Sequence, residues 1–534
     1  MEVTGASVLR LQGITKRFGS LVANDDISLD LQAGEVLALL GENGAGKSTL
    51  MSILFGHYVA DEGSIEAFGA PLPPGNPKAA LAAGVGMVHQ HFTLADNLSV
   101  LDNVMMGTEP LWRVFSRRAA ARTRLLEVAQ RFGLPVQPDA KIGSLSVGER
   151  QRVEILKALY RGARILILDE PTAVLTPQES EALFATLAQM VAQGLSVIFI
   201  SHKLGEVLRV SRRIAVLRGG KLVAEARTAD TTQAQLALWM VGHAVEAAQR
   251  QPAGSVGDAV CVLDRVSTAS AKGGAQDHSS PLHEVSLTLR GGEITAIAGV
   301  SGNGQVALAE LLCGTRRAVS GTALLMGRAL PPSPSRLVQR GVARIPEDRH
   351  AVGVVGDLPV WENAVSERLR SPVFSRWSLF VRRAAARQHA RRIEQAFDVR
   401  GAGLMSPARS LSGGNMQKLI LGRALLAPEQ VEDADNKKYP TRAPRLIVAH
   451  QPTWGLDIGA VAYVQQQLIA ARDAGAAVLV ISDDLDEVLA LGDRVSVMHG
   501  GHLGEARPAS AWTREAIGLA MAGATDASRG KARP

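Results

Sequence analysis

One stretch decides the fold of this chain: Gly41-Glu42-Asn43-Gly44-Ala45-Gly46-Lys47-Ser48-Thr49. An apolar run, 36–40, precedes it and another, 50–54, follows it, which predicts a strand, a glycine-rich loop and a helix. The spacing matches G-x-x-x-x-G-K-[ST], in which backbone N–H groups at the start of a helix surround phosphate. We therefore expect residues 41–49 to hold the phosphates of a nucleotide, with Lys47 at the β- and γ-phosphates and Ser48 on Mg²⁺.

Two acidic residues follow a second apolar run, 165–168. Asp169 and Glu170 would stand at the carboxyl end of this strand, the edge at which open α/β sheets bind ligands. There Asp169 can hold Mg²⁺ through its water shell, and Glu170 can accept a proton from the water that attacks the γ-phosphate. An acidic strand end is a weak indication alone, but it becomes a strong one downstream of a phosphate-binding loop.

The composition limits the class of protein. A chain of 534 residues, 46% hydrophobic, predicts a globular protein with two or more domains. The sequence has no apolar run long enough to cross a membrane, and its start does not resemble a signal peptide, so we expect synthesis to end in the cytosol. Two cysteines, Cys261 and Cys313, make neither a disulfide framework nor a zinc site. The formal charge of +7 indicates solubility first and attraction to lipid headgroups second.

The sequence contains one domain twice. The glycine loop returns as 299–306, the basic stretch 114–122 has its partner in 379–387, and 145–151 is matched by 411–417, all in the same order. We predict a first domain at 1–246, a linker at 247–257, a second domain at 258–525 and a disordered tail at 526–534. One charged insertion, 429–442, breaks the repeat, and we expect an exposed loop without a function there.

Within each half, short apolar strands alternate with helical segments, which predicts an α/β fold: two tandem domains of a mixed, mainly parallel sheet core plus a helical subdomain. Two basic segments, 117–132 and 382–397, are predicted to be long helices of that subdomain. Their arginines are more often a solvated face than a binding site, although proximity to a membrane would suit them.

The ordered motifs resemble those of ABC-transporter ATPase domains. The resemblance rests on the loop 41–49, Gln90, the segment 145–148, the run 169–172 and His202, and it covers nearly the whole chain twice. It implies that Phe18 stacks on adenine, that Gln90 binds Mg²⁺ and senses the membrane partner, and that His202 contacts the γ-phosphate. Alone, Phe18 and His202 would be interpreted as a packed aromatic and a structural histidine.

Domains of this family act as head-to-tail pairs, so the resemblance implies that the two halves pair internally. One composite site would then join the first-half residues with a signature segment from the second half. Its second-half members are Ser412, Gly413, Gly414 and Asp457. The signature glycines would lie at a helix N-terminus that faces the γ-phosphate.

The other composite site is predicted to be degenerate. Its Walker-type positions hold Gln305 for the lysine, Val306 for the hydroxyl that binds Mg²⁺, His450 for the aspartate, Gln451 for the glutamate and Asp483 for the histidine. Glu347 falls where Gln90 does, and Thr176 falls where Asp457 does. Val306 has no oxygen for Mg²⁺ and Gln451 cannot act as a base, so we expect one hydrolytic site, and nucleotide binding without turnover stays open at the other.

The resemblance extends to the fused ATPases of bacterial nucleoside and sugar importers. It implies ATP and Mg²⁺ as cofactors, two integral-membrane permease subunits and an extracytoplasmic solute-binding protein as partners, no nucleic acid, and a peripheral place on the cytoplasmic face of the inner membrane. Details such as 89–94 and 346–350 favour nucleosides over monosaccharides. Two alternatives remain: a soluble tandem protein acting on ribosomes or DNA, and a nucleotide-binding scaffold without hydrolysis.

Overall fold

Each half of the chain folds into a unit of its own, Met1–Val245 and Glu246–Pro534. The structure is a computed structural model that describes residues 6–19, 21–89, 92–109, 117–172, 175, 177–201, 203–243, 254, 256–269, 280–377, 379–401, 403–428, 443–521 and 523. Gln90, His202 and Thr176 lie outside these ranges, as do the insertion 429–442, the tail 526–534 and most of the predicted linker.

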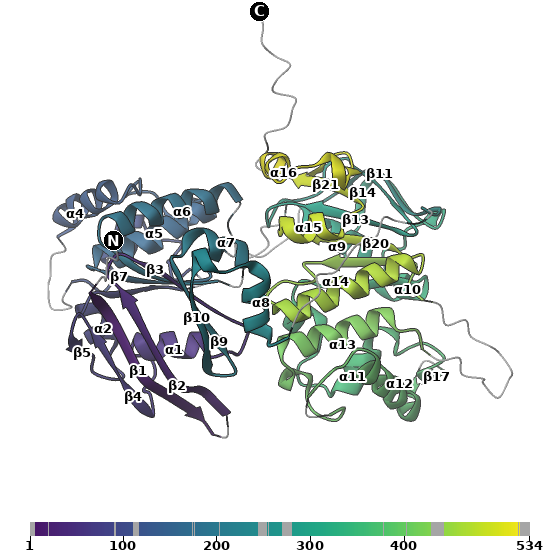
Figure 1. Cartoon of the computed structure of the whole chain (residues 1–534). Coiled ribbons are helices and arrows are strands. Elements are labelled where there is room, and N and C mark those ends of the chain that lie inside the picture. The colour runs from purple at the N-terminus through teal and green to yellow at the C-terminus, as the bar shows by residue number, and fades with distance from the viewer. Residues whose placement is uncertain are drawn as a thin grey trace, which may run out of the picture. The chain divides into compact units, whose positions relative to one another are not determined.

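The core of the first unit is a six-stranded sheet of order β10-β9-β3-β8-β7-β6, in which only the β10–β9 pair is antiparallel. Its strands are β3 (Val36–Gly41), β6 (Val85–Val88), β7 (Ile165–Asp169), β8 (Ser196–Ile200), β9 (Arg213–Arg218) and β10 (Lys221–Arg227). The central strands are apolar runs buried on both faces, as parallel strands between helices must be. The predicted α/β fold with a mixed, mainly parallel sheet is confirmed (Figure 1).

A second, antiparallel sheet of order β2-β1-β4-β5 was not predicted from the sequence. Its strands are β1 (Ser7–Phe18), β2 (Leu21–Gln32), β4 (Glu62–Ala67) and β5 (Ala70–Pro71). Leu9 and Leu11 of this sheet share one apolar core with Leu37 of β3 and with Leu50 and Met51 of the helix after the glycine loop. Apolar side chains from both sheets therefore pack against that helix and fix its position.

The helices of the first unit are α1 (Lys47–Leu54), α2 (Pro77–Ala82), α3 (Val100–Met105), α4 (Arg118–Arg131), α5 (Val147–Tyr160), α6 (Pro177–Ala192), α7 (Leu204–Val210) and α8 (Gln233–Val241). The helix α4 is the basic helix predicted at 117–132, one residue shorter at each end. It packs with α3 and α5 in the predicted helical subdomain.

The second unit repeats this architecture. Its antiparallel sheet has the order β12-β11-β14-β15, and its main sheet has the order β16-β19-β20-β13-β21-β22, with β23 paired to β21. Read in the same direction, the first unit gives β6-β7-β8-β3-β9-β10, so equivalent strands occupy equivalent places.

The strands of this unit are β11 (Ala259–Thr268), β12 (Val285–Arg290), β13 (Glu293–Ala298), β14 (Ala318–Leu325), β15 (Arg328–Ala329), β16 (Val342–Ile345), β17 (Ser375–Arg376), β18 (Phe380–Val381), β19 (Leu446–His450), β20 (Ala477–Ser482), β21 (Arg494–His499), β22 (His502–Leu503) and β23 (Arg507–Pro508). Its helices are α9 (Gln305–Cys313), α10 (Pro334–Gln339), α11 (Val360–Val365), α12 (Arg383–Ala396), α13 (Gly413–Leu425), α14 (Ile458–Asp473), α15 (Leu485–Leu491) and α16 (Arg514–Met521). The helix α12 is the basic helix predicted at 382–397.

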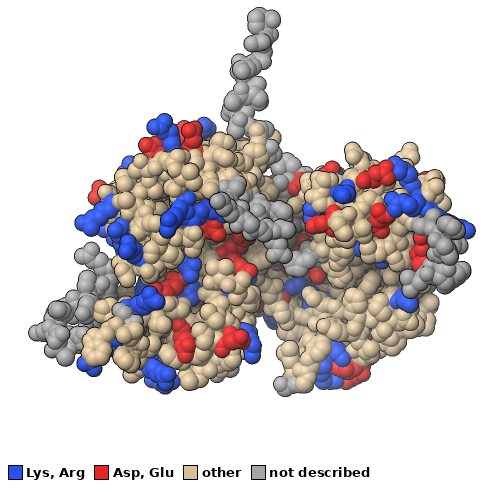
Figure 2. Space-filling model, turned by 180° about the vertical axis from the view of Figure 1, so that it is seen from behind, with Lys and Arg blue, Asp and Glu red and all other residues tan. Residues whose placement is uncertain are grey.

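The charge is mixed over the face that Figure 2 shows, where lysine and arginine side chains alternate with aspartate and glutamate and are separated by broad uncharged areas. Among the helices that the structure describes, none is long and apolar enough to cross a membrane.

Candidate functional site

The glycine loop of the first unit has the backbone geometry of a phosphate cradle. β3 ends at Gly41, and α1 begins at Lys47 with Gly46 as its N-cap at φ +99°. Gly44, at φ +85°, is exposed, and a Cβ added to it would meet no atom within 4 Å, so its backbone faces open space where a ligand can approach. The N–H groups of the first helical turn and the helix dipole favour an anion here.

A buried asparagine that sequence reasoning missed supports this loop. The Nδ2 of Asn24, on β2, donates to the carbonyl of Gly46 at 3.1 Å, and Asn24 is 0% exposed. No local pattern marks this residue, because its partner lies 22 positions away on another element.

Lys47 is held inside the loop. Its Nζ donates to the carbonyls of Gly41 at 2.6 Å and Glu42 at 3.0 Å, and the residue is 8% exposed. Burial lowers the pKa of the Lys47 ammonium, and the nearby carboxylates of Glu170 and Asp169 act in the opposite direction. The ammonium and the two carboxylates therefore interact in one site, as the sequence pattern predicts.

Asp169 and Glu170 lie at the carboxyl end of β7, where the sequence predicts them. Burial and the neighbouring Glu170 raise the pKa of Asp169, whereas Lys47 lowers it. A buried carboxylate beside a second one gains most from a bound cation, so Asp169 together with the exposed hydroxyl of Ser48 fits Mg²⁺. Glu170 has a left-handed backbone, with φ +46°, and its N–H donates to the carbonyl of Ile200 at 2.9 Å.

Phe18 lies at the end of β1 and is 43% exposed. Its ring contacts Tyr58 edge to face at 5.6 Å, and Lys16 Nζ lies 5.5 Å from its centre. An exposed aromatic face beside a lysine suits a purine base that carries phosphates. The stacking on adenine stays a prediction, as do the roles of Gln90 and His202.

The signature residues of the second unit lie together. Ser412 caps α13, whose first residues are Gly413 and Gly414, and Asp457 caps α14 through a hydrogen bond from the N–H of Ala460 at 2.7 Å. A Cβ on Gly414 would lie 3.7 Å from Asp457 Oδ2. The N-termini of α13 and α14 therefore lie side by side.

Arg349 belongs to this cluster, although sequence reasoning missed it. The residue opens a π-helical turn, Arg349–Gly353, and is 9% exposed. A Cβ placed on Gly455 would lie 3.1 Å from its Nη2, and one on Gly413 would lie 4.0 Å from its Cζ. The guanidinium is therefore buried between the signature glycine and the loop before α14.

In the second unit, a glutamine amide replaces the lysine of the glycine loop. Gln305 begins α9, and its Nε2 donates to the carbonyl of Val300 at 2.7 Å, as Lys47 does to Glu42. Gln305 is 5% exposed and its Oε1 is buried without a hydrogen-bond partner among the residues described. The loop of the second unit therefore keeps this hydrogen bond, but it has no positively charged side chain.

The groups around this loop are neutral or acidic. His450 ends β19, and burial lowers its pKa to about 4, so the imidazole is neutral at pH 7. Its Nδ1 lies 3.5 Å from Oε2 of Glu347, whose pKa is raised by burial and by Asp483. Two carboxylates without a lysine repel a polyphosphate, and the degeneracy of this half stays a prediction.

The second unit nevertheless has the backbone conformation of the first at this strand end. Gln451 has φ +48°, matching the +46° of Glu170, and its N–H donates to Ile481 at 2.7 Å. Because the same strained conformation occurs with a glutamate and with a glutamine, it is required by the strand end rather than by the side chain.

The buried carboxyl group of Glu487 predicts that the stability of the protein depends on pH. Glu487 is 3% exposed and accepts a hydrogen bond from Thr453 Oγ1 at 2.8 Å, and burial raises its pKa from 4.5 to about 7. The unfolded chain releases this proton near pH 4.5, so its stabilising contribution is complete below that pH and is lost as the pH rises through about 7.

We therefore expect Glu487→Gln to stabilise the protein relative to wild type at pH 8 by up to about 3 kcal/mol, and far less at pH 4.5. Urea titrations of both proteins at the two pH values measure this difference. A pH-independent difference would contradict it.

Two glycine substitutions test the loop geometry. A Cβ on Gly46 would lie 2.3 Å from the carbonyl oxygen of Ala23 and 2.5 Å from Asn24 Nδ2, so Gly46→Ala is expected to cost more than about 2 kcal/mol of unfolding free energy. Gly44→Ala meets open space and should cost only the roughly 1–2 kcal/mol of a left-handed alanine. Equal losses in urea titrations would contradict this account.

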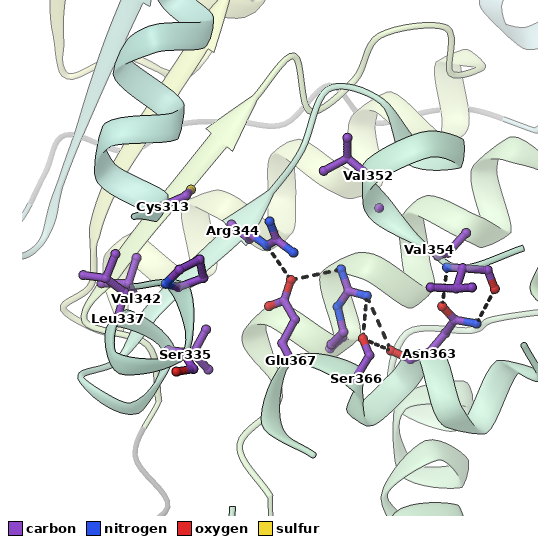
Figure 3. Close-up of a pocket in the computed structure, with 15 residues that line it drawn as sticks. Cys313, Ser335, Leu337, Val342, Arg344, Val352, Val354, Asn363, Ser366 and Glu367 are labelled. Carbon is purple, nitrogen blue, oxygen red and sulfur yellow. Dashed lines mark hydrogen bonds and ion pairs between the residues drawn. The ribbon is translucent and has the colours of Figure 1, made fainter. Parts of the chain in front are cut away.

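A cavity of about 350 Å³ lies elsewhere in the second unit (Figure 3). Glu367 Oε1 forms ion pairs there with Arg344 Nε at 2.7 Å and with Arg423 Nη2 at 3.3 Å. Burial raises the pKa of the lining Cys313 thiol to about 12, so it stays protonated. None of the residues predicted to bind nucleotide lines this cavity, which is therefore separate from the loop site.

Comparisons with known proteins identify the family of this chain. The family model described as ABC transporter matches residues 24–173 and 282–436. The nucleoside import ATP-binding protein NupA of Lactococcus lactis is 40% identical over 97% of this chain and 98% of its own length. The guanosine import ATP-binding protein NupO of Bacillus subtilis is 40% identical over 98% and 99%.

A sugar-importer relative is equally similar. The glucose import ATP-binding protein TsgD13 of Haloferax volcanii is 40% identical over 98% of both chains. A solved structure named RNase-L Inhibitor covers 96% of this chain and 93% of its own, with a TM-score of 0.60 and 17% identity, which shows a likeness of fold alone.

Proposed function

Because the chain belongs to the ABC transporter family, we propose that it is the ATP-hydrolysing subunit of an importer whose solute is a nucleoside. As a member of this family it binds ATP and hydrolyses it to power transport. The observation that carries the assignment is the full-length similarity, at 40% identity, to two importer subunits named for nucleosides. The glucose relative at the same identity keeps a monosaccharide as the second candidate.

In the proposed mechanism, residues 41–49 hold the phosphates and Lys47 neutralises the charge that develops on the γ-phosphoryl group. Glu170 accepts a proton from the water whose oxygen bonds to the γ-phosphorus as the bond to the bridging oxygen breaks. Ser48, Gln90 and Asp169 would hold Mg²⁺, which when bound would supply further positive charge, and His202 would donate to a γ-phosphoryl oxygen. Phe18 stacks on the adenine.

The proposal extends to a site shared by the two halves. Ser412, Gly413, Gly414 and Asp457 would complete the first-half site, because two helix N-termini that lie together favour the γ-phosphate. The counterpart site, with Gln305, Val306, His450, Gln451 and Asp483, would not turn over ATP. The neutral histidine and paired carboxylates described above support this asymmetry.

The partners follow from the import function. We propose two integral-membrane permease subunits and an extracytoplasmic solute-binding protein, with this chain at the cytoplasmic face of the inner membrane. No nucleic acid takes part. The likeness to the solved structure named RNase-L Inhibitor is one of fold alone, at 17% identity, so it does not support action on ribosomes.

Reconstitution tests the proposal. The chain, the permeases encoded beside it and their binding protein are placed in proteoliposomes, and ATPase activity is measured with nucleosides or with monosaccharides. We expect stimulation by a nucleoside and none by ribose, galactose or glucose. Stimulation by a monosaccharide and not by a nucleoside would show that the solute is a sugar. Co-purification with ribosomes instead of permeases would overturn the importer assignment.

A further inference from the structure

The positive charge of the chain is concentrated in one segment of the second unit. Residues 368–392 contain eight arginines and neither aspartate nor glutamate. The net charge of this segment, +8, exceeds the formal +7 of the whole chain, so the remainder is almost neutral. This segment therefore needs an explanation of its own.

Three of these arginines form a stripe on α12. Arg383, Arg387 and Arg391 are spaced four residues apart, which places them on one face of the helix. The adjoining face is buried through Ala386, His389, Ala390 and Ile393, and Arg387 is half-buried with its guanidinium 5.4 Å from the centre of the Trp361 ring, so Arg383 and Arg391 are the exposed members. Like charges four residues apart on a helix repel one another, so the stripe lowers the stability of the free protein and would gain from an anion.

In the equivalent helix of the first unit, α4, the two arginines that correspond to Arg383 and Arg387 are neutralised. Arg118 pairs with Asp102, and Arg122 pairs with Asp139, with Nη2–Oδ2 at 2.6 Å. In the second unit, Met405 stands at the position of Asp139. Within the ranges that the structure describes, no ion pair is formed by Arg370, Arg376, Arg383 or Arg391, all of which are exposed.

A hairpin directly before α12 presents apolar side chains to solvent. Its strands β17 and β18 pair Ser375 with Val381 and Arg376 with Phe380. The exposed fractions are 73% for Trp377, 79% for Leu379 and 64% for Phe380. Figure 1 shows this hairpin beside α12.

The conformation of the hairpin is fixed by packing and by a hydrogen bond at its base. Phe374 at its base is 1% exposed, and the N–H of Arg382 donates to the carbonyl of Phe374 at 2.8 Å. Trp377 has φ +54°, a conformation that costs a bulky side chain free energy, and its ring meets Phe380 edge to face at 6.3 Å. The protein thus accepts strain and exposure to hold an aromatic tip beside the arginine stripe.

We propose that this tip and the stripe contact the anionic phospholipid headgroups of the membrane. Tryptophan and phenylalanine enter the headgroup region of a bilayer, and arginine binds lipid phosphate there. A nucleic acid would also attract arginines, but Leu379, the most exposed of the three apolar side chains, cannot stack on a base. The contact would hold the second unit at the membrane whichever solute is imported.

Flotation of the purified full chain with lipid vesicles tests the proposal. We expect binding to vesicles of phosphatidylcholine and phosphatidylglycerol in equal parts, weakened by salt, and none to phosphatidylcholine alone. Replacing Arg376, Arg383 and Arg391 together by Gln should lower the affinity on the order of 100-fold. The double variant Trp377→Ala with Phe380→Ala should lower it at least about tenfold.

A charge-matched variant is the control. Arg265, Arg400 and Arg409 have side chains 76%, 79% and 70% exposed, and each pairs with an aspartate. Replacing these three by Gln should lower the affinity less than the stripe variant does, with ATPase activity retained in both as proof of folding. An equal loss, absence of vesicle binding by wild type, binding to RNA instead, or loss of permease co-purification with unchanged vesicle binding would each overturn the proposal.

Discussion

Glu170→Gln is expected to lower the turnover number for ATP hydrolysis by about 10²- to 10⁴-fold, the contribution of a positioned general base. Glu170 follows β7 directly, beside Asp169 and within the field of Lys47. Glutamine has the same shape but cannot take the proton of the attacking water, so ATP binding should remain. Steady-state hydrolysis and a separate binding titration with a fluorescent ATP analogue distinguish the two effects.

Gln451→Ala is the matched control, because Gln451 has the same left-handed backbone at the equivalent strand end. It should leave turnover within about twofold of wild type, since the residue has no base to lose. A loss comparable to that of Glu170→Gln would show that the second half takes part in hydrolysis.

Lys47→Ala should reduce kcat/KM for ATP by about 10²- to 10³-fold, the usual cost of one preorganised charged donor at a developing oxyanion. The ammonium is buried and bridges two carbonyls of the loop, so its loss also loosens the cradle. Kinetics over a range of ATP concentrations give kcat/KM directly.

Gln305→Ala removes the equivalent side chain of the second half. It breaks the hydrogen bond to Val300 and should cost roughly 1 kcal/mol of unfolding free energy, with kcat/KM within about threefold of wild type. Similar losses of kcat/KM in Lys47→Ala and Gln305→Ala would contradict the proposed difference between the two halves and would indicate two hydrolytic sites.

The local parts of the site could be predicted from sequence. The strand, loop and helix around Lys47 and the acidic end at Asp169 and Glu170 each depend on residues adjacent in the chain. The two basic helices are likewise predicted to within one residue at each end.

The parts that sequence reasoning missed depend on partners far along the chain. The antiparallel sheets pair strands whose partners are fixed by tertiary packing, and no short pattern reveals them. Asn24 and Arg349 act through contacts with Gly46 and with the signature glycine, and an isolated asparagine or arginine carries no local mark of such a contact.

The left-handed turn at Gln451 has a consequence for how the second half could change. Since the main chain there already has the conformation that holds Glu170 in the first half, placing a carboxylate at this position would require a new side chain and no change of the main chain. At this strand end the two halves share one backbone, so the proposed difference in turnover depends on the side chains that the backbone presents.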